Sequence, residues 1–366
     1  NMSELEFVTK HRRHLHQYPE LSLHEFETTT YIKEFLDKLG VEYDCPLETG
    51  AIAYLEGQSN HTIAFRADID ALPIFEENDI DYRSKTDNVM HACGHDIHMA
   101  SILATGTQLK EIEDELNGRV RLIFQPAEEL GHGAFEIINT GVLKGAKAVL
   151  GFHNYPTLKV GEFAIKSGAI TSAVDRFEFN VKGKGAHAAK PEQGNDPVIV
   201  VGQLINSLQT IVSRNLSAFD SAVVTIGEIS CGNTWNVIAD KAYIQGTVRS
   251  FDEDKRHYIE NRMKNIADGL SRVFNVDIDL TYSRLPGAVV NDAHLTQEAI
   301  EAAKNVGYHV SMLDEPVTIG EDFSGYTEEY PGVFAFIGSD SKFDLHHPNY
   351  HPDERILEKV PQYFVQ

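Results

Sequence analysis

The sequence predicts an α/β protein in which a mixed, largely parallel sheet with helices on both faces is interrupted by an inserted ferredoxin-like α+β domain. Three observations support this fold class. Short apolar runs alternate with helical segments through the first 170 residues. From residue 171 the predicted elements follow the order β-α-β-β-α-β, which is that of a ferredoxin-like unit. From about residue 290 the pattern of the first part returns.

The predicted strands of the first part are dense in apolar residues, as buried parallel strands are. They cover residues 62–69, 119–126 and 146–154. Between them, the segment DIHMASILATGTQLKEIEDEL has apolar residues at helical spacing, and GAFEIINTGVL is a shorter helix candidate. Because strand and helix alternate, we expect the strands to form one layer covered by helices.

The inserted segment has a different pattern of predicted strands and helices. DRFEFNVKG alternates like a half-exposed strand, DPVIVVGQLINSLQTIVSRN is helical, and SAVVTIGEIS with NVIADKAYIQGTVRSF predicts an antiparallel pair. A long helix follows, with Asp252 and Glu253 in its first turn, where the helix dipole favours anions. We therefore expect a discontinuous catalytic domain of residues 1–170 and 286–366, and an insert of residues 171–285.

Composition narrows the classes of function. A chain of 366 residues is long enough for two domains. With 55 acidic against 32 basic residues, the net charge of −23 repels polyanions, so we expect no nucleic-acid partner. Three scattered cysteines do not form a disulfide framework and suit a reducing compartment. No apolar run reaches the roughly 18 to 20 residues of a membrane span. We expect a cytoplasmic protein without a membrane partner.

Polar residues follow the predicted strands, at the edge where ligands bind in open α/β sheets. They are Asp68, Asp70, Glu128, Glu129, His153, His346 and His347. In the stretch HACGHDIHM, Cys93 and His95 precede the long helix, so a loop brings them to the same edge. Thiolate, imidazole and carboxylate are ligands of a borderline divalent metal. The expected metal ligands are Cys93, His95, Glu129, His153 and His347.

Five donors exceed what one tetrahedral ion takes with a water position left open, so we expect two bridged divalent ions. The main alternative is a cysteine nucleophile, Cys93, with His95 or His153 as its base. That alternative leaves the glutamate pair and the remaining histidines unexplained. His98 continues into an apolar helix face, which favours a packing or supporting role, and His91 stays ambiguous.

Five motifs carry a resemblance to a known family. HACGHDIHMA, FQPAEELGHGA, GAHAAKPEQGNDP, GEDFS and LHHPNY occur in an order that resembles the amidohydrolase branch of the dinuclear metallopeptidases. That branch includes aminoacylases, hippurate hydrolase and N-acetyl-diaminopimelate deacetylase, and the wider family contains glutamate carboxypeptidase. The resemblance implies the five ligands named above, with Glu128 as the general base. Arg66 stands where the peptidase branches carry a ligand histidine, which favours the amidohydrolase branch and leaves Asp68 as a carboxylate that orients a ligand imidazole.

The resemblance also implies roles for the insert, as a lid and dimerisation domain of a homodimer. There the histidine matching His187 reaches the partner subunit's active site, and Asn236 and Arg249 match positions that hold the substrate carboxylate. The residues alone leave alternatives open. His187, in the Gly-rich segment GKGAHAAKP, is either an oxyanion donor or a surface histidine, and Arg249 is either a bidentate carboxylate ligand or one half of a strand-end salt bridge.

The expected reaction is hydrolysis of the amide bond of N-acyl, first of all N-acetyl, amino acids. A metal-activated water attacks the carbonyl, and Glu128 acts as the general base. Two alternatives are a metallo-carboxypeptidase or dipeptidase, and a metal-dependent binding protein with the same fold. A pure binding protein has no need of Glu128. Ligand type does not choose among zinc, manganese, nickel and cobalt.

Overall fold

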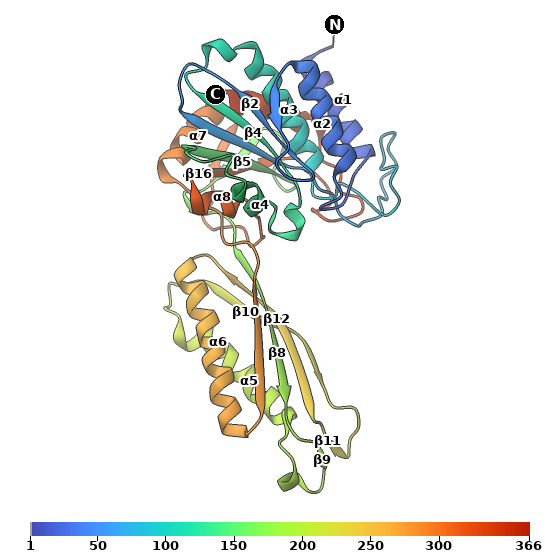
Figure 1. Cartoon of the computed structure of the whole chain (residues 1–366), viewed down its shortest axis with the longest axis vertical. Helices are drawn as coiled ribbons and strands as arrows, with labels where there is room; N and C mark the ends of the chain where they lie inside the picture. The colour runs from blue at the N-terminus through green and yellow to red at the C-terminus, as the bar shows by residue number, and fades with distance from the viewer. Residues whose placement is uncertain (1) are drawn as a thin grey trace. The chain divides into compact units, whose positions relative to one another are not determined.

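The computed structural model of the protein describes residues 2–366. They form two compact units (Figure 1). Unit 1 comprises residues up to 170, 289–316 and 321–366, and unit 2 comprises residues 171–288 and 317–320. The expected insert covered residues 171–285, whereas unit 2 ends at residue 288 and also includes the short segment 317–320.

Unit 1 is built on an eight-stranded mixed sheet, as predicted. Its order is β1 (Glu42–Asp44), β2 (Ala51–Leu55), β4 (Arg119–Gln125), β3 (Thr62–Asp68), β5 (Ala148–Tyr155), β16 (Gly332–Gly338), β6 (Glu162–Ile165) and β15 (His309–Met312). The central pairs β3–β4, β3–β5 and β5–β16 are parallel, and so is β6–β15. The predicted strands of the first part are therefore neighbours whose carboxyl ends meet at one edge.

Helices lie on both faces of this sheet because successive strand residues point to opposite sides. On one face, Phe65 and Ala67 share a core with α1 (Glu4–Gln17), α2 (Phe26–Leu39), α3 (His95–Glu111), α7 (Ala293–Asn305) and α9 (Val360–Val365). On the other face, Phe323 lies against Gly151 of β5, where an added Cβ would meet its ring at 2.7 Å. Phe323 leads into α8 (Ser324–Glu329), which packs on α4 (Gly133–Asn139). The short elements of this unit are β7 (Gly168–Ala169), β14 (Val290–Asn291), η1 (Glu113–Glu115), η2 (Glu128–Leu130) and η5 (Glu354–Glu358).

Unit 2 has the predicted ferredoxin-like topology. Along the chain it contains β8 (Ala173–Lys182), α5 (Pro197–Thr210), β10 (Ala222–Cys231), β12 (Lys241–Ser250), α6 (Glu253–Phe274) and β13 (Asp277–Arg284). The strands form one antiparallel sheet in the order β10-β12-β8-β13. Asp252, expected in the first turn of α6, is the N-cap and accepts from the backbone N–H of Lys255, whereas Glu253 lies in the first turn as expected. Phe177, Phe179 and Ile244 belong to a core shared with both helices.

The remaining elements of unit 2 are short. They are β9 (Ala186–His187), β11 (Val237–Ile238), η3 (Pro191–Gln193) and the π-helical turn η4 (Ile211–Asn215). Figure 1 shows β9 and β11 beyond the end of the four-stranded sheet. None of the helices formed by residues 2–366 is both long and apolar enough to cross a membrane.

Candidate active site

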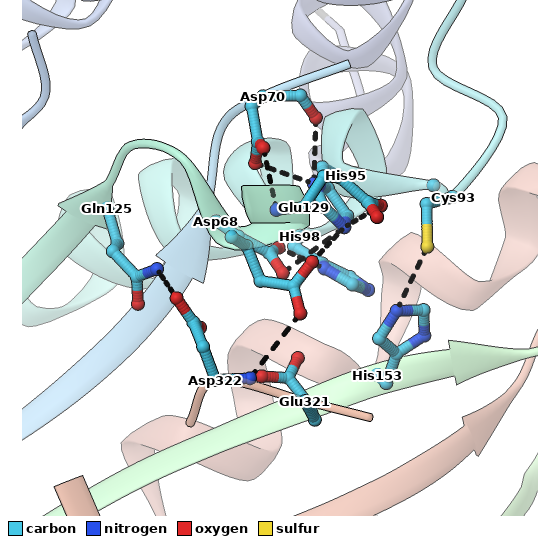
Figure 2. A network of polar contacts seen from close by, with 12 residues as sticks. Asp68, Asp70, Cys93, His95, His98, Gln125, Glu129, His153, Glu321 and Asp322 are labelled. Atoms are coloured by element: carbon cyan, nitrogen blue, oxygen red, sulfur yellow. Dashed lines mark hydrogen bonds and ion pairs between the residues drawn. The ribbon is translucent and has the colours of Figure 1, made fainter. Parts of the chain in front are cut away.

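Four of the five predicted metal donors lie together at the carboxyl edge of the sheet of unit 1 (Figure 2). Ligand atoms of Cys93, His95 and His153 all lie within 4.8 Å of one another, and so do those of His95, Glu128 and Glu129. Cys93 Sγ is 3.5 Å from His153 Nε2, and Glu129 Oε1 is 3.6 Å from His95 Nε2. The convergence follows from the parallel strands, which deliver Glu129 and His153 to the same edge.

The structure brings His346 to the fifth position, in place of the expected His347. His346 Nε2 lies 3.7 Å from Glu129 Oε1, and the His346 ligand atom is within 4.8 Å of those of Cys93 and Glu129. His346 adopts a left-handed φ of 70° while its backbone N–H donates to Ala92 O at 2.8 Å. His347 instead uses Nδ1 to accept from the Asn349 backbone and stacks on Phe343. The backbone direction at His346 therefore brings His346, rather than the expected His347, close to Cys93 and Glu129.

Gly94 places Cys93 and His95 on either side of a tight helix start. It precedes α3 with φ 76°, and a Cβ there would lie 2.2 Å from Asn154 Nδ2. Asn154 Nδ2 donates to the carbonyl of Cys93 at 3.0 Å. A side chain at residue 94 would thus displace Asn154 and, with it, the loop that carries Cys93.

The two neighbouring glutamates leave β4 through a strained turn. Ala127 has φ 56°, a conformation that costs free energy in a non-glycine residue and often occurs at functional sites. In η2, the Glu129 backbone N–H donates to Asp70 Oδ2 at 2.9 Å. Glu128 Oε1 accepts from the Asp322 backbone N–H at 3.5 Å, and its Oε2 lies 4.0 Å from His95 Nε2. Glu129 therefore lies slightly closer to His95 Nε2, at 3.6 Å, than Glu128 does, at 4.0 Å.

Neighbouring groups orient the imidazoles. His95 Nδ1 bonds the carbonyl of Asp70 at 2.8 Å, which directs Nε2 toward the other donors, 3.2 Å from Asp68 Oδ2. His98 Nδ1 bonds Asp68 Oδ1 at 2.6 Å, and His98 Nε2 accepts from the Asn154 backbone N–H at 3.0 Å. With both ring nitrogens engaged, His98 has the supporting position that its helix face predicts.

The residues fit divalent cations. Among residues 2–366, several buried atoms of this edge have no hydrogen-bond partner, which is costly for polar groups away from water. They are Asp68 Oδ2, Asp70 Oδ1, His95 Nε2 and Glu129 Oε1. Burial and the nearby carboxylates of Glu129 and Glu128 raise the pKa of the Cys93 thiol well above its usual value, and burial raises the pKa of Glu129 to about 7. A bound cation would give these buried atoms a partner. It would also stabilise the deprotonated, anionic forms of Cys93 and Glu129.

The sequence did not predict the contacts among Arg66, Glu321 and Asp322, which lie close to the carboxyl edge of the sheet. Arg66 is fully buried in β3 and contacts Glu321 at 3.1 Å and Asp322 at 2.6 Å. Figure 2 shows Asp322 joined to Gln125 by a hydrogen bond, with Glu321 next to Asp322. Two signals in the sequence point to them: a lone arginine inside the apolar run TIAFRADI, and the motif GEDFS.

The remaining predicted residues lie in unit 2. His187 is exposed in β9 and pairs with Val237 of β11, and the Ala188 backbone N–H donates to Asn236 O at 3.1 Å. The side chain of Trp235, next to Asn236, is 91 % exposed. Arg249 lies on β12, where it donates to Thr247 Oγ1 at 2.7 Å, and burial lowers its pKa. His187 and Asn236 thus lie together at one two-stranded sheet.

Comparisons with known proteins show the family to which the chain is related. Residues 64–366 match the model of peptidase family M20/M25/M40. An N-acetyl-L-cysteine deacetylase of Bacillus subtilis is 46 % identical over 97 % of this chain and 85 % of its own length. A second B. subtilis protein, named N-acetylcysteine deacetylase, is 42 % identical over 97 % and 94 %.

Two solved structures are similar over nearly the whole chain. A dinuclear metal-binding M20 peptidase of B. subtilis has a TM-score of 0.88 at 39 % identity, covering 99 % of this chain and 96 % of that one. A putative aminohydrolase of methicillin-resistant Staphylococcus aureus has a TM-score of 0.93 at 36 % identity, covering 98 % and 95 %. The resemblance, the fold class and the expectation of a hydrolase are confirmed. The chain belongs to peptidase family M20/M25/M40.

Proposed function

We propose that the protein is a dinuclear metal-dependent amidohydrolase that cleaves N-acyl, first of all N-acetyl, amino acids. One observation carries this proposal. Glu128 is a buried carboxylate that stands beside the donor set, with one oxygen 4.0 Å from His95 Nε2. A binding site needs only donors, whereas hydrolysis also needs a group that moves a proton.

The donor set that we propose is Cys93, His95, Glu129, His153 and His346, with Asp68 orienting His95. Two divalent ions bound there would polarise the amide carbonyl and lower the pKa of water from about 15.7 toward about 7. Glu128 accepts a proton from the attacking water and delivers it to the departing nitrogen. Burial and the charges of Glu321 and Glu129 raise the pKa of Glu128 well above its usual value, which suits a group that must hold a proton in between.

The substrate class is supported by the names of two relatives, both of which are deacetylases of N-acetylcysteine. A carboxypeptidase or dipeptidase is the second candidate, because the solved relative with 39 % identity is described as a peptidase. The two candidates differ in what lies on the acyl side of the scissile bond: an acetyl group, or a second amino-acid unit.

Unit 2 supplies the remaining proposed roles. We assign His187 to the developing oxyanion of the partner subunit's site in a homodimer, and Asn236 with Arg249 to the substrate carboxylate. The exposure of His187 and of Trp235, which precedes Asn236, supports a docking role for β9 and β11. Three free cysteines support a reducing, cytoplasmic location.

The test uses the two adjacent glutamates as a matched pair. Glu128→Gln keeps the shape and removes the base, so turnover should fall at least about 100-fold while both metal ions stay bound. Glu129→Gln should lose bound metal as well as turnover. The measurements are elemental analysis of the purified protein and rates with N-acetyl amino acids and dipeptides. Loss of metal from Glu128→Gln, or faster turnover of dipeptides by the wild type, would contradict the proposal.

A further inference from the structure

We infer that Arg66, Glu321 and Asp322, here called the Arg66 cluster, position the general base Glu128. This inference rests on the proposed role of Glu128, and it gives a function to an arginine that replaces a ligand histidine. The Arg66 cluster stands outside the five proposed donors and, on our proposal, outside the substrate contacts. Its members are therefore positioning residues.

Arg66 is held rigidly under the site. It lies in β3 between the parallel neighbours β4 and β5, and only 1 % of it is exposed. Its Nε donates to Gln125 Oε1 at 2.9 Å, and its two terminal nitrogens each donate to Glu321 at 3.1 Å. Nη2 also donates to Asp322 Oδ1 at 2.6 Å, and Nη1 lies 3.3 Å from Asp68 Oδ2. This pattern requires the planar, forked guanidinium, which a lysine ammonium does not reproduce.

The contacts of Arg66 lock the loop that precedes α8. Asp322 Oδ2 accepts from Gln125 Nε2 at 2.8 Å and from the Ala134 backbone N–H at 3.1 Å, so both of its oxygens are fixed. Glu321 Oε2 accepts from the Phe323 backbone N–H at 2.6 Å. The backbone of residues 321–323 consequently has little freedom to move.

The loop of residues 321–323 also donates a backbone hydrogen bond to the proposed base, Glu128. The Asp322 backbone N–H donates to Glu128 Oε1 at 3.5 Å, which leaves Oε2 on the side of His95. Because this hydrogen bond is already long, a small shift of the loop would release the Glu128 carboxylate. A misplacement of about 1 Å at a reacting group costs about 100-fold in rate.

Electrostatic repulsion among neighbouring carboxylates gives a second argument for this role of Arg66. Carboxylate oxygens of Glu128, Glu321 and Asp322 all lie within 4.8 Å of one another in a buried setting. Like charges at this distance repel strongly where water is excluded. Arg66 is the cation that contacts two of the three, so it offsets the repulsion that would push Glu128 away from its position.

Unit 2 offers a matched control. Arg256 is 4 % exposed and donates to Asp175 through Nε at 3.0 Å and through Nη2. It is thus a buried arginine in a similar bidentate ion pair, but we assign it no role in catalysis. Arg66→Lys and Arg256→Lys should both lower the melting temperature.

Only the first of these variants should impair catalysis. We expect Arg66→Lys to lower kcat about 10- to 100-fold, with KM and metal content nearly unchanged, because the base is displaced rather than removed. Arg256→Lys should keep kcat. Glu321→Gln is a milder second variant, which retains the shape and should lower kcat in the same direction. Equal kcat in all three variants and the wild type would overturn the inference. So would loss of metal from Arg66→Lys, because that result would show that Arg66 acts through Asp68 on the donors.

A double variant identifies the group through which Arg66 acts. In a Glu128→Gln background the base is already gone, so adding Arg66→Lys should lower the residual rate no further. If the two losses multiply, Arg66 acts independently of Glu128 and the inference is wrong. If Glu128→Gln alone keeps full turnover, the proposed base is wrong and the Arg66 cluster loses its role with it.

Discussion

His346 and His347 show how a single backbone angle assigns chemistry to one of two identical side chains. The left-handed φ of His346 sends its ring toward Glu129, while His347 stacks on Phe343. A left-handed conformation is uncommon for residues other than glycine, although histidine adopts it more often than most. Here the His346 backbone N–H donates to the Ala92 carbonyl.

This pair gives a prediction with its own control. His346→Ala should lower the affinity for one metal ion, because it removes a donor, and should reduce turnover accordingly. His347→Ala should keep metal and most of the activity, since that ring only packs and accepts one backbone N–H. Metal titration of both variants by calorimetry is the measurement. The assignment would be reversed by a weaker affinity in His347→Ala alone.

The sequence alone predicted that four of the five proposed donors lie at one edge of the sheet, because the carboxyl ends of neighbouring parallel strands meet there. It was not sufficient to choose between His346 and His347, since that choice depends on a loop angle and on Ala92, which lies far away along the chain. The partners of Arg66 were inaccessible for a similar reason. Hydrophobic periodicity locates strands and helices, but not the long-range polar contacts between their ends.

At the scale of elements, α1 supports the start of α3 through buried charges. Arg12 Nε donates to Asp96 Oδ2 at 2.8 Å, and His16 Nδ1 lies 2.9 Å from the same oxygen. His16 Nε2 lies 2.8 Å from Glu76 Oε2. Asp96 directly follows His95, one of the proposed donors, so α1 stabilises the turn that carries His95.

His16 makes this support dependent on pH. Burial lowers the pKa of His16, but Asp96 and Glu76 outweigh burial and raise it above its usual value. The stabilising contribution of His16 is therefore complete below about pH 6.5 and is lost as pH rises through the pKa of the folded state. Urea unfolding of metal-free protein should show the stability advantage of wild type over His16→Gln shrinking as pH rises from about 6.5.

His14, on the same helix, serves as the comparison. Burial lowers its pKa, so its protonation changes below about pH 6.5 and not above. The difference in unfolding free energy between wild type and His14→Gln should stay constant over the range in which that of His16→Gln changes. A constant difference for both variants would contradict the role given to His16.

The elements themselves follow from their sequences to different degrees. The capped helix α6 and the alternating strand β8 carry strong local signals, and both were predicted. The two-residue strand β9 was not predicted, because two residues carry no periodicity. The segment NVIADKAYIQGTVRSF was expected as one strand, which the structure divides into β11 and β12. These short strands exist because residues 186–187 and 237–238 meet in the folded unit.

At the scale of the whole molecule, each unit has a hydrophobic core of its own. The core of unit 1 gathers side chains from the eight-stranded sheet and its helices, and that of unit 2 gathers side chains from β8, β12, α5 and α6. Two separate cores are consistent with our proposal that unit 2 serves a partner chain while unit 1 holds the proposed donors.

Mixing two inactive variants tests whether His187 acts in the active site of the partner subunit. His187→Ala and Glu128→Gln should each be inactive, whereas a mixed dimer has one site with both residues intact if His187 acts across the interface. Random exchange should restore about a quarter of wild-type activity, because half of the dimers are mixed and one of their two sites is complete. Exchange demonstrated by differently tagged subunits, without recovery of activity, would place His187 in its own chain or outside catalysis.

The exposed indole beside Asn236 has a practical consequence. The chain contains a single tryptophan, so all tryptophan emission comes from one position, just before β11 and close to Val237, which pairs with His187. An indole in water emits at longer wavelength than one covered by protein. Trp235 is thus an intrinsic fluorescent probe of the β9–β11 sheet. A shift of its emission to shorter wavelength would report that β9 and β11 have become covered, without any added dye.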